Sequence, residues 1–191
     1  MGLRKIKKKR VFIIHGWEAT PVDNWFPWLK EELLALGFEV SVPAMPNTRR
    51  PKQKEWLNHL VKIIGKADEQ TFLVGHSLGV TIILQYLEKL PASQKIGGAI
   101  LVAGPIKSIG FWETADFFSK EFNFKKIKQA ARELILIYSD NDPLVPLEHG
   151  KILQKKIGAK FILIKKANHL CEGDGFFRLP MAREEILRMS K

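Results

Sequence analysis

The stretch that decides the fold is TFLVGHSLGVTIILQYL, residues 71–87. An apolar run is interrupted by Gly75-His76-Ser77-Leu78-Gly79 and then resumes with apolar residues at helical spacing. This pattern predicts a buried strand that is followed at once by a buried helix. A serine between two buried elements loses its contact with water, so it needs a hydrogen-bonding partner or a chemical role.

Short runs of β-branched and other apolar residues recur on both sides of this stretch. They are nearly continuous rather than alternating, which is typical of a parallel sheet covered by helices on both faces. The predicted strands are residues 10–15, 38–42, 71–75, 99–103, 134–139 and 160–164.

Amphipathic segments lie between these strands. The predicted helices are residues 24–36, 51–64, 78–90, 147–157 and 179–189. Asp23 is the expected N-cap of the first helix, and Gly37, Gly65, Pro91 and Gly158 mark helix ends. The alternation predicts a three-layer α/β/α sandwich with a six-stranded, mainly parallel sheet and right-handed crossovers.

Length and composition fit one domain. The chain has 191 residues, and its 46% hydrophobic and 27% charged content is ordinary for a soluble globular protein. We expect a single domain over residues 1–191, in which the basic segment 1–9 need not be rigid. The apolar run after that segment, residues 11–14, is too short for a signal peptide or a membrane span. The only cysteine, Cys171, cannot form an intrachain disulfide, which favours a cytoplasmic location.

The formal net charge of +11 raises the question of a polyanionic partner. However, lysines are scattered over every predicted helix, and no basic stripe alternates with exposed aromatic residues. No nucleic-acid motif appears either. We expect no specific nucleic-acid partner and no membrane partner, whereas a protein partner stays open.

Polar residues follow four of the predicted strands. In α/β sheets of this kind, ligands bind at the carboxyl ends of the strands. The segments there are His15-Gly16-Trp17, Gly75 to Gly79, Ser139 to Pro146 and Ala167-Asn168-His169. A serine, acidic residues and a histidine therefore occur in that order at one edge of the sheet.

Ser77 lies in a Gly-x-Ser-x-Gly motif between a predicted strand and a predicted helix. This is the context of a nucleophile elbow, a sharp turn that strains the serine and exposes its hydroxyl. We expect a Cβ at Gly75 or Gly79 to collide with the neighbouring strand or helix. The hydroxyl is a weak nucleophile near neutral pH and needs a base to remove its proton.

Five histidines are candidates for that base. His15 and His76 lie in the first-strand and elbow loops, and His59 lies on a helix before the elbow. His149 is expected to be a surface or capping residue of a later helix. His169 alone follows the last strand, where it can fold back over the sheet edge, and we favour it.

Two acids compete to orient the histidine. Asp140 lies at the end of the fifth strand and Asp142 begins the following turn, so their spacing does not decide between them. Pro143 and Pro146 restrain the loop after Asp142 and favour it, and Asp140 would then stabilise the turn.

An oxyanion hole needs two backbone N–H groups aimed at the developing charge. Leu78, at the start of the helix after the serine, can supply one of them. The loop after the first strand can supply the other, most simply through Trp17.

Several motifs together resemble those of a known family. They are His15-Gly16-Trp17, Asn24-Trp25-Phe26-Pro27-Trp28-Leu29, Val42 to Thr48, Gly75 to Gly79 and Asp174-Gly175-Phe176. The chain is similar, from about Val11 to its end, to the small α/β-hydrolases of the retinoblastoma-binding-protein-nine and YdeN type. The resemblance implies a minimal fold without a large cap, with Ser77 as nucleophile, Asp142 as acid and His169 as base. One departure is Asn168, where many hydrolases have glycine.

These residues point to a carboxylesterase-like serine hydrolase that acts on a small acyl substrate. The mechanism requires no metal or organic cofactor, and no cluster of metal ligands is visible in the sequence. Some of the aromatic residues in segment 104–133 are expected to line an apolar acyl pocket. They are Phe111, Trp112, Phe117, Phe118, Phe122 and Phe124.

Two alternatives accompany this interpretation. Cys171, two residues after His169, is a rival nucleophile, but it lacks an elbow and is expected to be a packed free thiol. The protein could also be a non-catalytic interaction module on a hydrolase scaffold. A complete triad discriminates against that alternative, because a pure binding protein has no reason to hold one.

Overall fold

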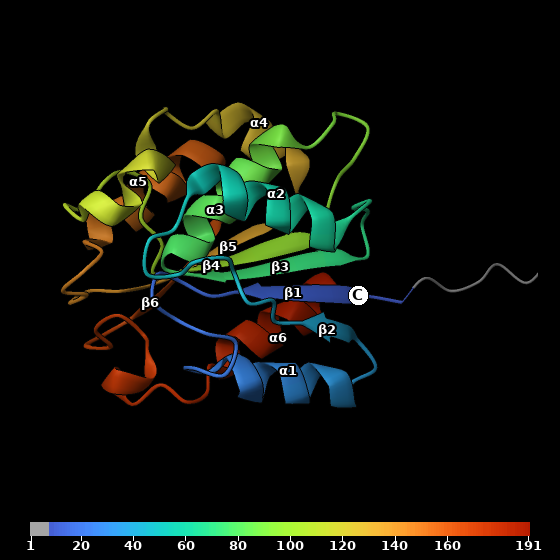
Figure 1. Ribbon diagram of the computed structural model, residues 1–191. Coiled ribbons are helices and arrows are strands. Elements are labelled where there is room, and N and C mark those ends of the chain that lie inside the picture. Colours follow the sequence, from blue (N-terminus) through green and yellow to red (C-terminus); the bar gives the residue numbers. More distant parts are fainter. Residues whose placement is uncertain (1–7) are drawn as a thin grey trace, which may run out of the picture.

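The computed structural model describes residues 8–191, and its centre is a single six-stranded sheet (Figure 1). The predicted basic segment 1–9 lies outside the described residues except for Lys8 and Lys9. The strands are β1 (Arg10–Ile14), β2 (Glu39–Ser41), β3 (Thr71–His76), β4 (Gly98–Val102), β5 (Leu134–Ser139) and β6 (Lys160–Ile164). Their order is β2-β1-β3-β4-β5-β6, and all neighbouring pairs are parallel. The predicted parallel sheet is therefore confirmed.

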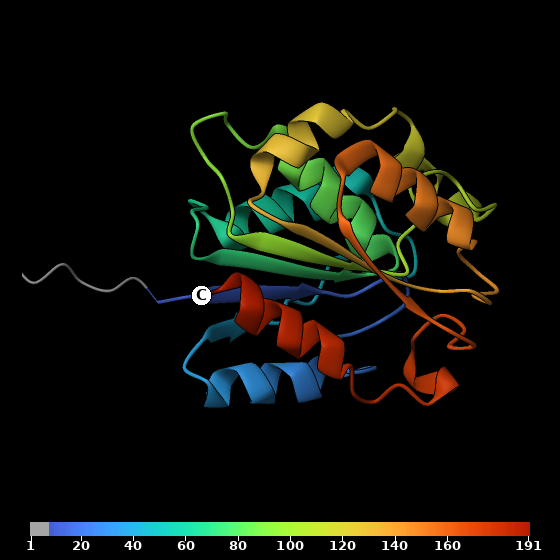
Figure 2. The same cartoon turned by 180° about the vertical axis from the view of Figure 1, so that it is seen from behind.

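Helices cover both faces of the sheet. The α-helices are α1 (Phe26–Ala35), α2 (Gln53–Ile64), α3 (Leu78–Lys89), α4 (Phe124–Ala130), α5 (Leu147–Ile157) and α6 (Pro180–Met189). Two short 3-10 helices are η1 (Trp112–Phe118) and η2 (Glu172–Asp174). Helices α1 and α6 lie side by side on one face, and α2 to α5 lie on the other (Figures 1 and 2). The three-layer sandwich is as predicted, whereas α4 and the two 3-10 helices were not expected. Within residues 8–191, no helix is both long enough and apolar enough to span a membrane.

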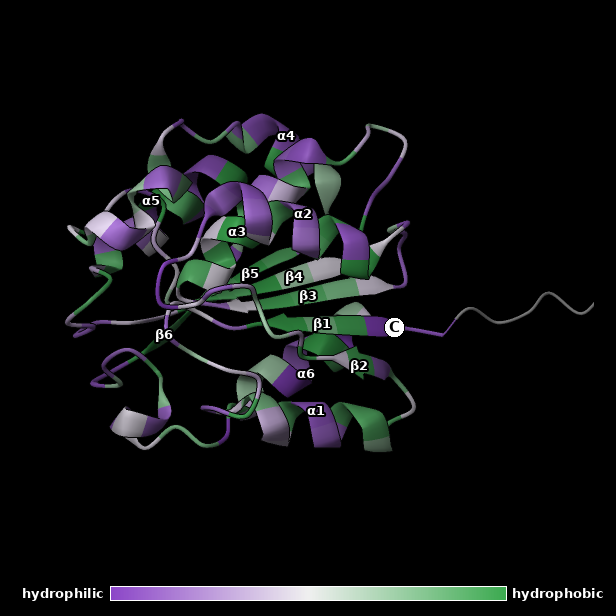
Figure 3. Cartoon of the chain, viewed as in Figure 1, coloured by the Kyte–Doolittle hydropathy of each residue, from purple (hydrophilic) through white to green (hydrophobic). Residues whose placement is uncertain are grey.

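The central strands β1, β3, β4 and β5 are mostly apolar because successive side chains enter two different cores, whereas the edge strands β2 and β6 are partly exposed (Figure 3). In β1, Phe12 and Ile14 belong to the core beneath α2 to α5. Val11 and Ile13 belong to the core shared with α1 and α6. Both faces of the strand are thus withdrawn from water, which explains the continuous apolar runs in the sequence.

Helix α1 begins later than the sequence pattern predicts, and Asp23 is not its N-cap. Asn24 has a φ of 56°, which a helical residue cannot adopt, and Trp25 occupies the N-cap position. The Asp23 carboxylate instead accepts a hydrogen bond from the Thr20 N–H at 2.6 Å. Only the start of the helix differs from the prediction, since the helix still buries Phe26 against the sheet.

Candidate active site

Ser77 occupies a sharp turn between β3 and α3. Its φ of 53° and ψ of −123° are rare for a residue with a side chain, and such conformations concentrate at functional sites. The turn is held by backbone hydrogen bonds from the Ser77 N–H to the Val102 carbonyl and from the Val80 N–H to the Ser77 carbonyl, both 2.9 Å. The position of the hydroxyl is therefore set by the backbone rather than by side-chain partners.

The glycines of the motif allow this turn to pack. A Cβ on Gly79 would lie 2.8 Å from the His15 carbonyl oxygen and even closer to that of Ile14. A Cβ on Gly75 would lie 2.9 Å from the carbonyl carbon of Gly79. Backbone atoms cannot move aside as a flexible side chain can, so both positions exclude any larger residue. The collisions expected from the sequence are present.

His169 and Asp142 meet at the opposite side of the site. His169 Nδ1 lies 2.8 Å from Asp142 Oδ2, and the Asp142 side chain is fully buried. The other oxygen, Oδ1, accepts the N–H groups of Leu144 and Val145 at 2.8 and 2.9 Å. Because a carboxylate only accepts, the neutral imidazole carries its proton on Nδ1, which leaves the Nε2 lone pair free to take a proton.

Asp140 has a different partner from Asp142. Its Oδ1 accepts the Lys166 N–H at 2.7 Å and so links the segment after β5 to the segment after β6. Asn141 reinforces this link, because it accepts the Asn168 N–H at 2.9 Å and donates to Asn168 Oδ1 at 2.7 Å. The two acids that the sequence could not separate therefore contact different groups.

A second acid, Asp174, contacts the loop that carries His169. Its Oδ2 accepts the His169 N–H at 2.9 Å, and its Oδ1 accepts Asn168 Nδ2 at 3.2 Å. Burial opposes the charge of this carboxylate, but its hydrogen bonds from Cys171, Asn168 and His169 outweigh burial and lower the pKa of Asp174. In the sequence, Asp174 stood out only as part of a family motif.

Asn168 has a left-handed backbone, with a φ of 45°. Glycine adopts this conformation freely, and asparagine does so more readily than most residues. Asn168 therefore holds a backbone conformation that glycine would also adopt freely.

Cys171 borders the same cavity as Ser77, and its thiol donates to Asp174 Oδ2 at 3.0 Å. Burial, together with the hydrogen bond and the negative charge of Asp174, raises the pKa of the Cys171 thiol. A thiol is a weaker nucleophile than a thiolate, so this environment works against the rival assignment.

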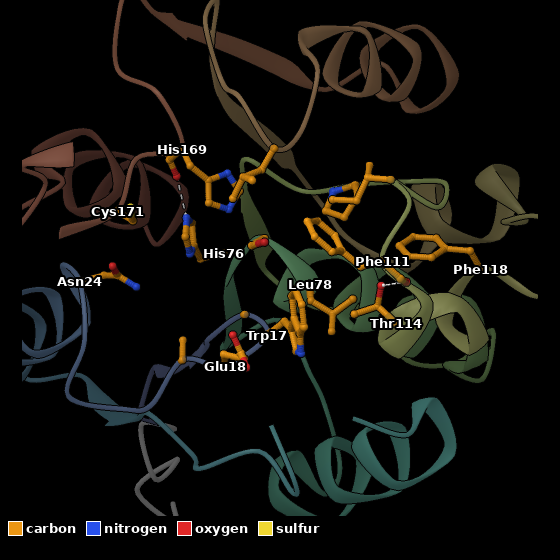
Figure 4. A pocket seen from close by; sticks show the side chains of 16 residues that line it. Trp17, Glu18, Asn24, His76, Leu78, Phe111, Thr114, Phe118, His169 and Cys171 are labelled. Carbon is orange, nitrogen blue, oxygen red and sulfur yellow. Dashed lines mark hydrogen bonds between the residues drawn. The ribbon is translucent and has the colours of Figure 1, made fainter. Parts of the chain in front are cut away.

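His76 is buried beside the candidate base. Its Nε2 lies 2.9 Å from the His169 carbonyl oxygen, and the two rings are 4.9 Å apart (Figure 4). Burial, aided by the nearby His169, lowers the pKa of His76 to about 3. His76 is therefore neutral and donates from Nε2. No sequence pattern indicates this contact, because the two residues lie far apart in the chain.

The expectation that His149 is a surface or capping residue is wrong. Its side chain is only 2% exposed, and its Nδ1 accepts the Ile106 N–H at 3.0 Å. The neighbouring Gly150 explains the burial, because a Cβ there would lie 2.8 Å from the Tyr138 ring. Helix α5 therefore packs closely on the sheet and carries His149 inside.

His15 is buried too and supports the loop after β1. Its Nε2 accepts the Met45 N–H at 3.0 Å, so its Nδ1 carries the proton and donates to the Gly16 carbonyl at 2.9 Å. Burial lowers its pKa. The ring therefore has a structural role and no free nitrogen to act as a base.

A cavity of about 300 Å³ opens between these elements (Figure 4). Both Ser77 and His169 border it. Its apolar wall consists of Pro105, Ile109, Phe111, Phe118 and Leu144. The Phe111 ring packs on the Trp17 ring, with 5.0 Å between centroids.

Of the six aromatic residues in segment 104–133, some of which were expected at the acyl pocket, Phe111 and Phe118 border this cavity. Phe117 and Phe122 are buried in the core, Phe124 packs against it, and Trp112 is 72% exposed. The six rings are thus divided among the cavity, the core and the surface, and the sequence alone does not tell which ring goes where.

Trp17 and Leu78 border the cavity next to Ser77. In the described part of the chain, neither of their backbone N–H groups makes a hydrogen bond to the protein. Leu78 is the first residue of α3, where the N–H has no partner within the helix. The loop after β1 is close to the nucleophile, since a Cβ on Gly16 would lie 2.9 Å from Ser77 Cβ. Two free donors thus flank the serine.

Over residues 8–191, the structure contains no group of three or more His, Cys, Asp or Glu side chains arranged to hold a metal ion.

Comparison with known proteins identifies a family to which the chain is similar. The sequence profile of the serine hydrolases matches residues 11–188. YdeN of Bacillus subtilis (strain 168) is 38% identical over 179 residues, which cover 93% of this chain and 94% of YdeN. The serine hydrolase RBBP9 of Rattus norvegicus is 24% identical over 158 residues, which cover 81% of this chain and 82% of RBBP9.

Solved structures show the same similarity. The crystal structure of the ydeN gene product from B. subtilis superposes with a TM-score of 0.92 at 36% identity, over 95% of this chain and 98% of that one. A meta-cleavage product hydrolase from Pseudomonas fluorescens shares the fold, with a TM-score of 0.70 at 14% identity over 96% of this chain and 90% of its own. The fold is thus that of an α/β-hydrolase, and the chain belongs to the serine hydrolase family.

Proposed function

We propose that the protein is a carboxylesterase-like hydrolase that cleaves small esters or related acyl compounds through Ser77, His169 and Asp142. The observation that carries the proposal is the hydrogen bond between Asp142 and His169 at a cavity that Ser77 also borders. The bond fixes the tautomer that a general base needs, and the strained turn holds the serine hydroxyl beside the same space.

In the proposed reaction, Ser77 Oγ attacks the acyl carbon while His169 Nε2 takes the hydroxyl proton. Asp142 stabilises the positive imidazolium, and the N–H groups of Trp17 and Leu78 bind the oxyanion. The intermediate collapses as His169 returns the proton to the leaving alkoxide, which departs as the alcohol. Water then attacks the acyl-enzyme with the same proton transfers and releases the acid and free Ser77.

Substrate binding is part of the proposed mechanism. Within residues 8–191, Ser77 Oγ has no hydrogen bond to His169 in the ligand-free structure. Such catalytic contacts are often long before a substrate binds and tighten in the complex. The acyl group would fill the space beside Phe111 and Phe118, where apolar contact favours it over water.

The proposal is tested by labelling with a fluorophosphonate probe. The wild-type protein should be labelled, and Ser77→Ala should not. Ser93→Ala changes an exposed serine in a turn that does not border the cavity, so it is the matched control and should be labelled like the wild type. Equal labelling of wild type and Ser77→Ala would refute the assignment, and transfer of the label to Cys171 would name a different nucleophile.

The substrate class is tested with a series of p-nitrophenyl esters of increasing acyl length and the matching anilides. We expect ester turnover to depend on Ser77 and to fall by several orders of magnitude in Ser77→Ala. A protein that accepts the phosphonate but cleaves the anilides faster than the esters would be an amidase instead. Failure to react with probe or substrate would favour a non-catalytic interaction module.

A further inference from the structure

The backbone around His169 is unusual. Asn168 before it and Leu170 after it both have positive φ angles, 45° and 58°. Residues with side chains rarely adopt this conformation, and leucine gains nothing from it. Two such residues on either side of one histidine need other contacts to hold them in place. The hydrogen bonds of the His169 peptide groups supply those contacts.

Both backbone polar groups of His169 are bound by side chains. Its N–H donates to Asp174 Oδ2 at 2.9 Å, and its carbonyl accepts from His76 Nε2 at 2.9 Å (Figure 4). A third side chain, Asp142, holds the imidazole at Nδ1. The residue is therefore fixed at its ring and at both sides of its backbone, and each partner comes from a different segment of the chain.

His76 connects this loop to the nucleophile. It is the last residue of β3 and directly precedes Ser77, so the same short segment that presents the hydroxyl also binds the histidine that would deprotonate it. In the sheet, β4 and β5 separate β3 from β6, so no ladder hydrogen bond joins the two loops. The His76–His169 contact bridges that distance directly.

The surroundings of His76 keep it a donor. Trp25 and Phe26 pack against its ring, with centroids 5.9 and 6.0 Å away. The titratable groups that face it are His169, Asp142 and Asp174, and burial outweighs the two carboxylates. His76 is therefore neutral near pH 7, and its Nε2 keeps its proton.

We propose that His76 and Asp174 are positioning residues that hold the backbone of His169 so that its imidazole reaches Ser77. The proposal rests on the proposed function, in which His169 is the base. His76 borders the cavity, but in this mechanism neither residue exchanges a proton or forms a bond with the substrate. Their effect is on the fraction of molecules in which the base is aligned, which changes kcat rather than KM.

The test compares His76→Leu with His76→Gln. Leucine fills similar space but cannot donate, whereas the glutamine side-chain amide can reach the position of Nε2 and donate to the His169 carbonyl. We expect kcat for a p-nitrophenyl ester to fall about a hundredfold in His76→Leu with KM little changed. His76→Gln should recover most of that loss. His59→Gln, on α2 away from the cavity, is the matched control and should behave like the wild type.

Asp174→Asn provides an independent variant at a partly exposed position. It replaces one accepting oxygen by a donor, so kcat should fall and the His169 amide hydrogen should exchange with solvent faster. This exchange reports the backbone contact even if the protein has no hydrolase activity. Wild-type protein without Ser77-dependent turnover would therefore overturn the proposed function and leave the contact measurable.

Three results would overturn the positioning role. They are wild-type kcat in His76→Leu, equal losses in His76→Leu and His76→Gln, and unchanged exchange of the His169 amide in Asp174→Asn. If His76→Leu does not fold, His76→Gln and Asp174→Asn still decide the matter. Near-wild-type kcat in His76→Gln together with lowered kcat and faster exchange in Asp174→Asn supports the proposal.

Discussion

The turn that carries Ser77 and the loop that carries His169 are held by different physical means. The turn depends on the absence of side chains at Gly75 and Gly79, where carbonyl groups of neighbouring segments fill the space. The loop depends on side chains, because Asp142 and Asp174 bind the ring and the backbone of His169. A side chain that clashes with backbone atoms cannot be accommodated by a small movement, whereas a lost hydrogen bond can be partly replaced by a hydrogen bond to water. Damage to the first region should therefore affect folding, and damage to the second should affect turnover.

The largest effect is expected for Gly79→Ala. Its new methyl group would press on the carbonyl groups of Ile14, the last residue of β1, and of His15, which follows it, and these backbone groups cannot move aside. We expect the free energy of unfolding to fall by about 4 kcal/mol or more, measured by urea denaturation. Gly173→Ala in the other region is the control, since its nearest neighbour would be Cys171 Sγ at 3.7 Å. Equal costs for the two substitutions would remove the distinction between the regions.

The next effect is expected for Asp142→Asn. The amide can present its donor to Nδ1 and so favour the wrong tautomer of His169. Turnover should fall by roughly 10⁴, with a thermal midpoint that changes far less than in Gly79→Ala. A variant that keeps turnover would show that the His169 ring does not depend on this carboxylate.

His76 belongs to the turn but binds the loop, and its burial gives a pH effect. Its folded pKa, about 3, lies below the unfolded value, so the unfolded chain binds an extra proton once the pH falls below that unfolded value. Stability is full near pH 7 and decreases as the pH falls toward 3. By pH 5 the loss from this group is about 2 kcal/mol.

This effect can be measured by urea denaturation at pH 7 and pH 5 for wild type and His76→Gln. The variant lacks the titrating group, so its stability should change less between the two pH values. Burial also lowers the pKa values of His15 and His149, which act in the same direction in both proteins. A parallel pH dependence of the two proteins would contradict the burial effect at His76.

The smallest effect is expected for Asp140→Asn. Asp140 accepts one backbone N–H, from Lys166, and stands in an exposed position. Removing this carboxylate should lower the free energy of unfolding by about 1 kcal/mol and leave most of the turnover unchanged. Asp140→Asn and Asp142→Asn should be compared by thermal midpoint and by kcat. An inactive Asp140→Asn with an active Asp142→Asn would mean that the acid is the other one.

Features that depend on local pattern could be predicted from the sequence. Apolar runs located every strand, and the glycines around Ser77 indicated the sharp turn. The start of α1 was misplaced, because the positive φ of Asn24 is not encoded in its apolar spacing. The bounds of α4 could not be predicted within segment 104–133, because some of its aromatic residues pack in the core and others line the cavity.

Contacts between distant segments were harder to predict, because spacing along the chain does not determine them. Asp140 and Asp142 differ only in which one faces His169, and that depends on how the loops after β5 and β6 meet. The donor at His76 and its acceptor at His169 are 93 residues apart, so no spacing rule connects them. Nothing in the helical pattern distinguished the inward side of His149 from a surface position.

The coverage of the sheet has a consequence for synthesis on the ribosome. One face is covered by α1 and α6, which come from opposite ends of the chain and lie side by side. Until α6 has emerged, Ile100 and Val102 in β4 lack part of their cover, and the nascent sheet exposes apolar surface to water or to chaperones. The loop with His169 is also made late. A chain stopped before residue 180 should therefore hold five of the six α-helices found in residues 8–191 and still be prone to aggregation, and the formation of α6 should remove that tendency.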